Sequence, residues 1–277
     1  MIEISLIPEF AFLSDKGKVR SDNQDSVVVD ELLGLAAVAD GMGGHNAGEI
    51  ASDIAITAIK ESLIALRSGD MRVKNKDPHL SESVNDIHFA AIKANEAVHA
   101  ASMEQTNRKG MGTTLSAILL GSRSAAIAHI GDSRIYLYRE SNMVQLTSDH
   151  SLVMEQVRKG IMTKEEAEIS SMQNILTRAM GITKAVKLDV GEVTLADGDR
   201  LLLCSDGLFK AASETDMRGV LSSALPAAMM CRYLVDKALE NGGPDNVSVV
   251  VIKLRNPKFM EKIAQLARAA INAFANP

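Results

Sequence analysis

The chain has 277 residues, a formal net charge of −5, 46% hydrophobic residues and only 3% aromatic residues, with no Trp. The hydrophobic content is sufficient for a substantial core in one large domain or two small ones, whereas the acidity and the lack of aromatic side chains argue against polyanion binding and base stacking as the main activity. Cys204 and Cys231, the two cysteines, lie in apolar segments, so neither a disulfide framework nor a thiolate zinc site is expected. No secretory signal pattern and no apolar run near 18 residues is present, and we therefore expect a cytoplasmic protein without a membrane span.

Two short runs rich in apolar and β-branched residues, 9–13 and 24–30, open the chain and predict neighbouring strands. Between them Arg20 and Asp25 lie five positions apart, at the entrance to the second strand. Taken alone, they are explained by a surface arginine and a turn aspartate. In the functional interpretation, Arg20 binds a phosphoryl group through its guanidinium fork and Asp25 orients a metal-bound water.

The apolar run 33–39 predicts a buried strand that ends at Asp40 and is followed by glycines at 41, 43 and 44. Glycine lets the backbone approach a bound group closely, so that carbonyls and amides become available as ligands. A metal or a phosphate suits such a corner. The alternative is a turn in which Asp40 caps the helix that begins near Glu49.

The middle of the chain predicts two helices on a sheet, 47–66 and about 81–105, joined by a charge-rich connection. Strands are then predicted at 114–120, 124–130 and 134–139. The turn between the last two of these strands carries Asp132, which taken alone is a structural turn residue.

A helical segment through Arg158 and a capping box, Thr163 with Glu166, predict a small helical excursion at about 160–171. Strands are predicted at 186–190, 200–204 and 247–252, with a helix at 226–240 before the last strand. The strand ending at Cys204 is followed by Asp206 and a glycine, and the turn 241–246 delivers Asp245 to the last strand.

Four acids, Asp25, Asp40, Asp206 and Asp245, thus lie at strand ends that are far apart in the sequence. With no matching His or Cys cluster, they indicate a hard-cation site of oxygen ligands that retains waters, and hence Mg²⁺ or Mn²⁺ rather than Zn²⁺. Structural calcium is the alternative, but no EF-hand loop is present. Distant ligands that a fold brings together favour a catalytic site.

The chain resembles the metal-dependent serine/threonine protein phosphatases of the PPM or type 2C family, in their bacterial form. The resemblance covers about 10–253 and rests on six motifs that occur in the family's order. These are Arg20-x-x-Asn23-Gln24-Asp25, Asp40-Gly41-Met42-Gly43-Gly44-His45, Gly112-Thr113-Thr114, Gly131-Asp132-Ser133-Arg134, Ser205-Asp206-Gly207 and Gly243-Pro244-Asp245-Asn246.

The resemblance implies an α+β fold, a four-layer α-β-β-α sandwich of two central antiparallel sheets flanked by helices, with the metals at one sheet edge. It implies that Asp40 bridges two Mn²⁺ or Mg²⁺ ions, that the Gly41 carbonyl binds one of them, and that Asp206 and Asp245 complete the other. Asp25 would act through metal-bound water, and Asp132 would contribute to a third metal. Arg20 would bind the substrate phosphate. His45 is a candidate proton donor, although the general-acid histidine of animal members directly follows the Asp-Gly pair, where this chain has Met42.

The resemblance further implies hydrolysis of phosphoserine and phosphothreonine in proteins, by in-line attack of a metal-bridging water or hydroxide and without a covalent phosphoenzyme. The partners of such a protein would be phosphorylated proteins and a cognate Ser/Thr kinase whose action it reverses, and not nucleic acid. The other hypothesis is a binding module of the same fold that has lost turnover, but such modules usually lack the metal acids.

We assign 1–255 to the catalytic domain and 256–277 to an appended amphipathic helix. Residues of 258–274 recur at a spacing of three to four and form one apolar stripe, which must be buried. The stripe could pack on its own sandwich, on a partner protein, on a second copy of the chain or on an anionic membrane surface.

The excursion at 160–174 takes the place of the family's flap but lacks the His-Pro pair often found there.

Overall fold

Two antiparallel sheets pack face to face in the computed structural model, which describes residues 4–43 and 47–275, with side chains omitted at 107 and 268–275. The first sheet has the order β1-β11-β10-β7-β8. Its strands are β1 (Ile7–Asp15), β11 (Val247–Arg255), β10 (Arg200–Cys204), β7 (Arg134–Arg139) and β8 (Asn142–Gln145). The second has the order β2-β3-β5-β6-β9, with β4 paired to β3. Its strands are β2 (Asp25–Asp30), β3 (Leu35–Met42), β4 (Gly112–Thr113), β5 (Leu115–Leu120), β6 (Ser124–Ile130) and β9 (Asp189–Thr194).

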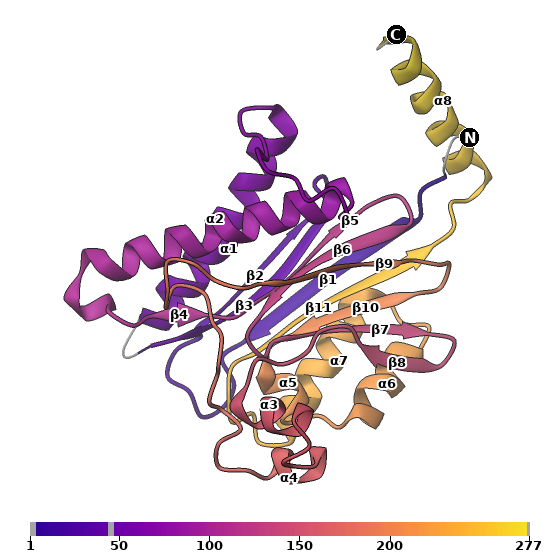
Figure 1. Ribbon diagram of the computed structural model, residues 1–277. Coiled ribbons are helices and arrows are strands. Elements are labelled where there is room, and N and C mark those ends of the chain that lie inside the picture. Colours follow the sequence, from indigo (N-terminus) through magenta and orange to yellow (C-terminus); the bar gives the residue numbers. More distant parts are fainter. Residues whose placement is uncertain (1–3, 44–46, 276–277) are drawn as a thin grey trace.

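Helices cover the outer face of each sheet (Figure 1). The long pair α1 (Ala47–Ser68) and α2 (Glu82–Glu104) packs on the second sheet, and α5 (Asp206–Phe209), α6 (Glu214–Ser222) and α7 (Ala227–Glu240) pack on the first. The α-β-β-α sandwich predicted from the family resemblance is therefore confirmed.

Alternation along the central strands explains why both sheets are buried on both faces. In β3, Leu35, Ala37 and Ala39 face the α1–α2 layer, whereas Ala36 and Val38 face the other sheet. In β11, Val249 and Val251 pack against α7 and its neighbours, and Val250 and Ile252 fill the space between the sheets. Small alanines in β3 allow the close approach of α1, in line with a core that lacks Trp and is poor in other aromatic residues.

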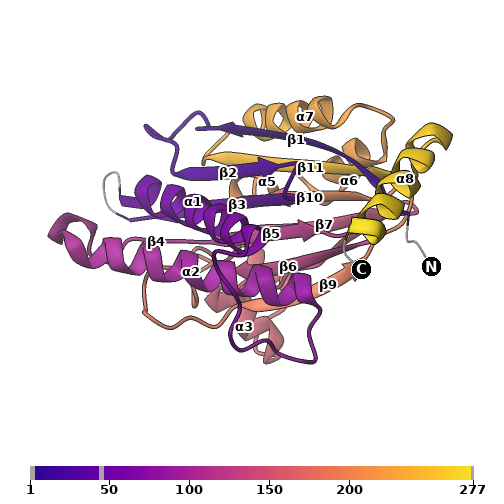
Figure 2. The ribbon, with the colours of Figure 1, turned by 90° about the horizontal axis from the view of Figure 1, so that it is seen from above.

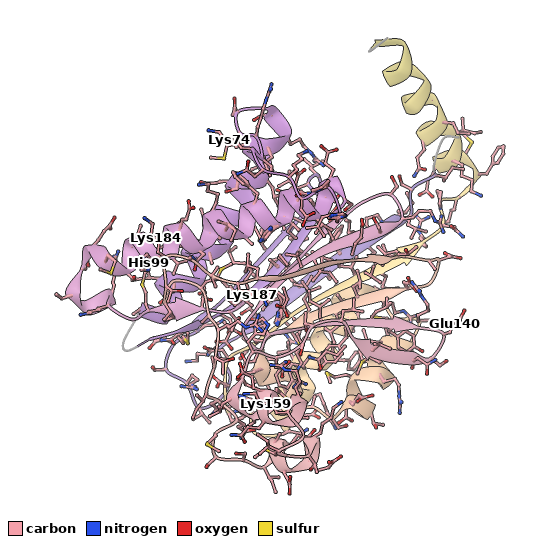
Figure 3. The ribbon with its side chains drawn as sticks, in the orientation of Figure 1. Lys74, His99, Glu140, Lys159, Lys184 and Lys187 are labelled. Atoms are coloured by element: carbon pink, nitrogen blue, oxygen red, sulfur yellow. The ribbon has the colours of Figure 1, made fainter. Side chains whose placement is uncertain are left out.

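The chain segment that links β8 of the first sheet to β9 of the second contains α3 (Leu152–Arg158) and then the predicted excursion with α4 (Lys164–Glu168). The predicted capping box of Thr163 and Glu166 is present. Lys159 marks this segment in Figure 3, below the sheets. A 3-10 helix, η1 (Thr106–Arg108), links α2 to β4.

One expected strand was displaced, and two elements, β8 and α6, were not foreseen. The strand expected at 186–190 is β9 (Asp189–Thr194), an edge strand whose position is set by pairing with β6 and not by its own composition. The β7–β8 hairpin was missed because its turn, Glu140-Ser141, uses two non-glycine residues at positive φ, 49° and 70°, in place of the usual Asn-Gly signal (Figure 3). Helix α6 was also missed.

The C-terminal helix α8 (Phe259–Ala275) stands away from the sandwich, near the N-terminal end of the described chain (Figures 1 and 2). The side chain of Gln265 bonds the backbone N–H and C=O of Ser5, at 3.1 and 3.2 Å. Phe259 and Met260 are 75% and 72% exposed. Self-packing of the stripe is thus contradicted for the part of α8 whose side chains are described. Within the described residues, no helix is long and apolar enough to cross a membrane.

Candidate functional site

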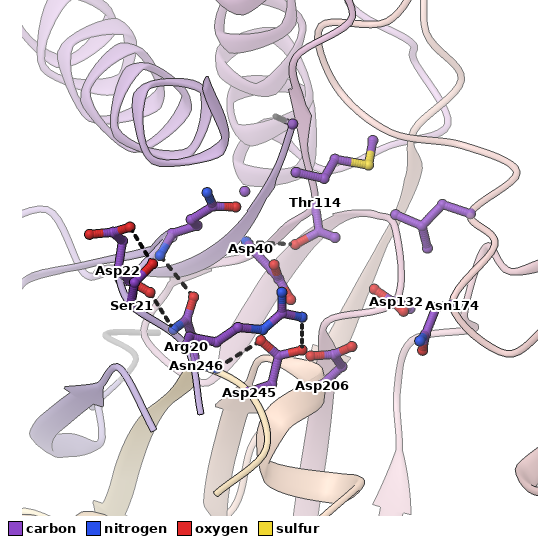
Figure 4. Close-up of a pocket in the computed structure, with 15 residues that line it drawn as sticks. Arg20, Ser21, Asp22, Asp40, Thr114, Asp132, Asn174, Asp206, Asp245 and Asn246 are labelled. Carbon is purple, nitrogen blue, oxygen red and sulfur yellow. Dashed lines mark hydrogen bonds and ion pairs between the residues drawn. The ribbon is translucent and has the colours of Figure 1, made fainter. Parts of the chain in front are cut away.

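Strand ends from both sheets surround one cavity of about 340 Å³ (Figure 4). Its acidic lining residues come from five separate parts of the chain: the loop between β1 and β2, the end of β3, the β6–β7 turn, the start of α5 and the turn before β11. The lining residues are Arg20, Ser21, Asp22, Gln24, Asp40, Gly41, Met42, Gly43, Thr114, Asp132, Asn174, Leu176, Asp206, Asp245 and Asn246.

Asp25 and Asp40 are direct partners in the antiparallel register of β2 and β3, which places two carboxylates at the same sheet end. The backbone N–H of Asp40 donates to Thr114 Oγ1 at 2.9 Å. Asp25 is buried behind the cavity wall, where Ser205 Oγ donates to its Oδ2 at 2.7 Å. Its other carboxylate oxygen, Oδ1, is buried without a hydrogen-bond partner.

Asp206 and Asp245 are brought together by close packing of the turns that carry them. A Cβ at Gly207 would lie 2.0 Å from the carbonyl oxygen of Asn246, so only glycine fits here. Close packing therefore explains why an apolar strand, an acid and a glycine follow one another at this turn.

The turn that carries Asp132 crosses from one sheet to the other, since β6 and β7 belong to different sheets. Gly131 has a φ of 103° and contacts Thr114 closely. Its N–H donates to His150 Nδ1 at 3.1 Å, and Ser133 Oγ lies 2.6 Å from Thr114 Oγ1. Thr114 therefore supports both the Asp40 and the Asp132 corners.

Arg20 lies at the rim of the cavity, and its guanidinium donates to Asp245 Oδ2 at 2.8 Å. Asn246 holds the loop that carries Arg20: its side chain donates to the carbonyls of Lys16 and Asp22 at 2.9 Å and accepts from the N–H of Gln24 at 2.8 Å. In the part of the chain that the structure describes, the guanidinium makes this single hydrogen bond, and the Arg20 side chain is 57% exposed. It can therefore bind an anion that enters the cavity.

Burial and mutual repulsion make this cluster electrostatically costly. Burial raises the pKa of Asp25 to about 7, and the charges of Asp206 and Asp245 add to this effect. The pKa of Asp40 is raised well above its usual range by burial and then by the charges of Asp25, Asp206, Asp132 and Asp245. Burial and Asp206 likewise raise the pKa of Asp132 to about 7. Such a cluster carries more negative charge than the two cations beside it, Arg20 and Lys210, neutralise.

These residues fit divalent cations that keep much of their water. Among the described residues, no three acidic, His or Cys side chains converge closely enough to enclose an ion by themselves. The carboxylates of Asp40, Asp132, Asp206 and Asp245 instead line a cavity of about 340 Å³, which has room for water beside an ion. Hard oxygen donors, few in number and completed by water, suit Mg²⁺ and Mn²⁺.

Of the residues singled out from the sequence, Arg20, Asp40, Gly41, Asp132, Asp206 and Asp245 all line the cavity, and Asp25 lies behind it. His45 lies outside the described residues. Roles for Thr114, Ser205 and Asn246 were not predicted, although each belongs to one of the six motifs. Lys210 and Asn174 also contribute to this site and were missed, because no motif marks them.

The sequence profile of the family described as protein phosphatase 2C matches residues 14–240. The chain belongs to the protein phosphatase 2C family. Protein phosphatase PhpP of Streptococcus pneumoniae is 38% identical over 254 residues, which is 89% of this chain and 97% of that protein. The family predicted from the six motifs is therefore confirmed.

Solved structures agree with this 2C-type assignment. The serine/threonine phosphatase PstP/Ppp of Mycobacterium tuberculosis superposes with a TM-score of 0.79 at 35% identity, covering 90% of this chain and 99% of that one. The catalytic domain of PstP in complex with two manganese ions gives a TM-score of 0.78 at 34% identity, covering 91% of this chain and 100% of that one. At this similarity, the fold is shared.

Proposed function

We propose that this 2C-type protein hydrolyses phosphoserine and phosphothreonine in proteins with Mn²⁺ or Mg²⁺ as cofactor. The observation that carries the proposal is the convergence of Asp40, Asp132, Asp206 and Asp245 on one cavity with Arg20 at its rim. Relatives named as serine/threonine phosphatases, one of them solved with two manganese ions, support it.

The proposed ligands follow from the positions of the carboxylates. Asp40 lines the cavity together with Asp132, Asp206 and Asp245, and we assign it to bridge two cations. The Gly41 carbonyl, Asp206 and Asp245 would complete the binding of these two cations, and Asp132 is the family's candidate ligand for a third. When bound, the cations would supply an activated water and neutralise the phosphoryl oxygens in the in-line transition state.

The other residues orient the reactants. Arg20 would bind the substrate phosphate through donors that Asp245 leaves unused. Asp25 Oδ1 would accept a hydrogen bond from a water at the cavity edge, while Ser205 fixes Oδ2. Proton donation by His45 stays a proposal from the motif alone.

Two alternatives have less support. A cysteine nucleophile would need a thiolate near neutral pH, but burial raises the pKa of both Cys204 and Cys231 to about 12. A binding module without turnover would not need a cluster of buried acids, which costs folding free energy unless cations bind it.

Mn²⁺-dependent hydrolysis of a phosphothreonine peptide tests the proposal. Asp40→Asn and Asp206→Asn should each lower kcat/KM at least about 100-fold, because each removes ligand charge from the cations. Circular dichroism should show an intact fold. Asp53→Asn, at an exposed position on α1, is the matched control and should keep full activity. Near-normal turnover by either cavity variant would refute the assignment.

We further propose that the enzyme acts in the cytoplasm and reverses phosphorylation by a bacterial Ser/Thr kinase. The phosphatases from Streptococcus and Listeria among its relatives support this class of role. Phosphoproteome comparison of a strain with and without the active enzyme would test it: an unchanged level of every phosphoserine and phosphothreonine site would contradict it.

A further inference from the structure

Lys210 places a protein cation on one side of the carboxylate cavity. It follows α5 directly, and its ammonium donates to Asp206 Oδ2, four residues earlier, and to Asn174 Oδ1 at 2.6 Å. Asn174 belongs to the excursion between α4 and β9. The Lys210 side chain is 26% exposed, less than half the exposure of Arg20, so two chain segments hold it in place.

The same ammonium acts on Asp132. Its charge lowers the pKa of Asp132, against burial and Asp206, which raise it. In Figure 4 Asp132 and Asn174 lie on the same side of the cavity, away from Arg20, with Asp206 between. Lys210 therefore faces the Asp132–Asp206 side, while Arg20 pairs with Asp245 on the other.

A lysine differs from a metal ion at this position. It is a point charge with three donors on a flexible stem, so it can neutralise two carboxylates but cannot polarise a bound water as a divalent cation does. It also repels a divalent cation that approaches the same carboxylates. A carboxylate at this position would attract the divalent cation instead, and either a carboxylate or an amide would add an oxygen ligand.

We propose that Lys210 is a built-in counter-ion of the Asp132–Asp206 side, that it takes the place of a third metal ion there, and that it ties the excursion to the cavity through Asn174. This rests on the proposed function, since it presumes that the other carboxylates hold two cations. The consequence is an enzyme that loads two divalent ions and binds a third poorly, in contrast to the family expectation for Asp132.

Mn²⁺ binding provides the test, by isothermal titration calorimetry together with electron paramagnetic resonance of the free ion. The wild-type chain should bind two Mn²⁺ ions. Lys210→Met should gain a third, weaker site with affinity at least about tenfold higher than in the wild type, because a like charge has been removed. Lys210→Arg, which keeps the charge, should behave as the wild type. The double variant Lys210→Met with Asp132→Asn should lose the added site.

Equal stoichiometry and affinities in the wild type, Lys210→Met and Lys210→Arg would overturn the proposal while leaving the phosphatase assignment intact. A wild-type chain that binds no Mn²⁺ would instead overturn the proposed function. Three equally tight ions in the wild type would contradict the counter-ion role directly.

Hydrogen exchange of the excursion tests its tie to Lys210 separately. Asn174→Ala removes the acceptor of the 2.6 Å bond and should raise exchange across 160–174 several-fold. Mn²⁺ stoichiometry should stay at two, since the charge of Lys210 is retained. Gln173→Ala, a neighbouring substitution on the same segment, is the control and should change little. Equal exchange in the two variants would show that the bond does not hold the excursion.

Discussion

At the residue scale, the sequence was most informative where a single side chain ends a strand. Asp40 and Asp206 could be predicted because an apolar run, an acid and a glycine occur together, and the structure shows the packing that requires the glycine at each place. Lys210 and Asn174 could not be predicted, since they are 36 positions apart and meet only through the folded excursion. Local patterns contain no information on such a contact.

The position of Arg20 predicts a particular kinetic effect. If the guanidinium mainly binds phosphate in the ground state, Arg20→Ala should raise KM for a phosphopeptide about 10- to 100-fold and change kcat much less. Steady-state kinetics at saturating Mn²⁺ measures both values. Arg20→Lys should recover part of the loss, because it keeps the charge but not the fork. An unaltered kcat/KM in Arg20→Ala would make Arg20 a surface cation only.

The buried carboxyls predict how stability depends on pH in metal-free protein. Burial raises the pKa of Asp25 and of Asp132 to about 7 in the folded state, whereas the pKa of aspartate in an unfolded chain is about 3.9. Between these values the folded state binds more protons, so the free energy of unfolding falls as pH rises, by up to about 1.4 kcal/mol per pH unit for each group. Above about pH 7 both carboxyls are deprotonated in the folded state as well, so the free energy of unfolding no longer falls as pH rises.

Thermal unfolding in chelator from pH 5 to pH 8 checks this sign. The midpoint should decrease through the window in the wild type and decrease less in Asp25→Asn, which has one fewer carboxyl to deprotonate. Added Mn²⁺ should stabilise more at pH 8 than at pH 5, because the ligands must be deprotonated to bind. A midpoint that rises from pH 5 to pH 7 in chelator would contradict the assignment of these pKa shifts.

At the scale of elements, long periodic helices and central strands could be predicted well, and edge elements could not. Helices α1 and α2 begin and end within a few residues of their expected positions because each carries a continuous apolar face. Strand β9 was displaced because its pairing with β6, and not its own residues, determines where it lies, and β8 was missed because the turn before it, Glu140-Ser141, lacks the usual hairpin signal. The family resemblance, rather than periodicity, supplied the two-sheet architecture.

The junction of β3 with α1 predicts a steric effect. A Cβ at Gly41 would lie 2.0 Å from the carbonyl oxygen of Gly48 and 2.6 Å from that of Gln24, and backbone atoms cannot move aside as a flexible side chain can. Gly41→Ala should therefore lower the free energy of unfolding by about 2 kcal/mol or more. Urea unfolding in chelator measures this independently of metal binding.

Gly219→Ala is the matched control for this substitution. Nothing lies within 4 Å of the position where its Cβ would be, and Gly219 is exposed on α6. Alanine should therefore stabilise the helix by about 0.5–1 kcal/mol. If both variants unfolded at the wild-type urea concentration, the close approach of β3 and α1 would be wrong.

At the scale of the whole molecule, the cavity and α8 lie at different ends of the sandwich (Figure 1). The family profile ends at residue 240, and the solved relatives cover about 90% of the chain. Every residue proposed to bind metal or phosphate precedes Arg255. We therefore propose that 1–255 is the catalytic domain and that 256–277 is an appendage.

Truncation after Arg255 tests this division. It would remove the Arg255–Glu261 ion pair, in which both side chains are more than a third exposed, and the two bonds between Gln265 and Ser5. Exposed pairs of this kind contribute little to stability because water and salt screen them, and Phe259 and Met260 contribute little to the core because they are largely exposed. The truncated chain should therefore keep its thermal midpoint within a few degrees and its Mn²⁺-dependent turnover of p-nitrophenyl phosphate. It should also aggregate less, since a partly apolar helix has been removed. An inactive or unfolded product would show that α8 belongs to the catalytic core, and the apolar face would then need no partner outside it.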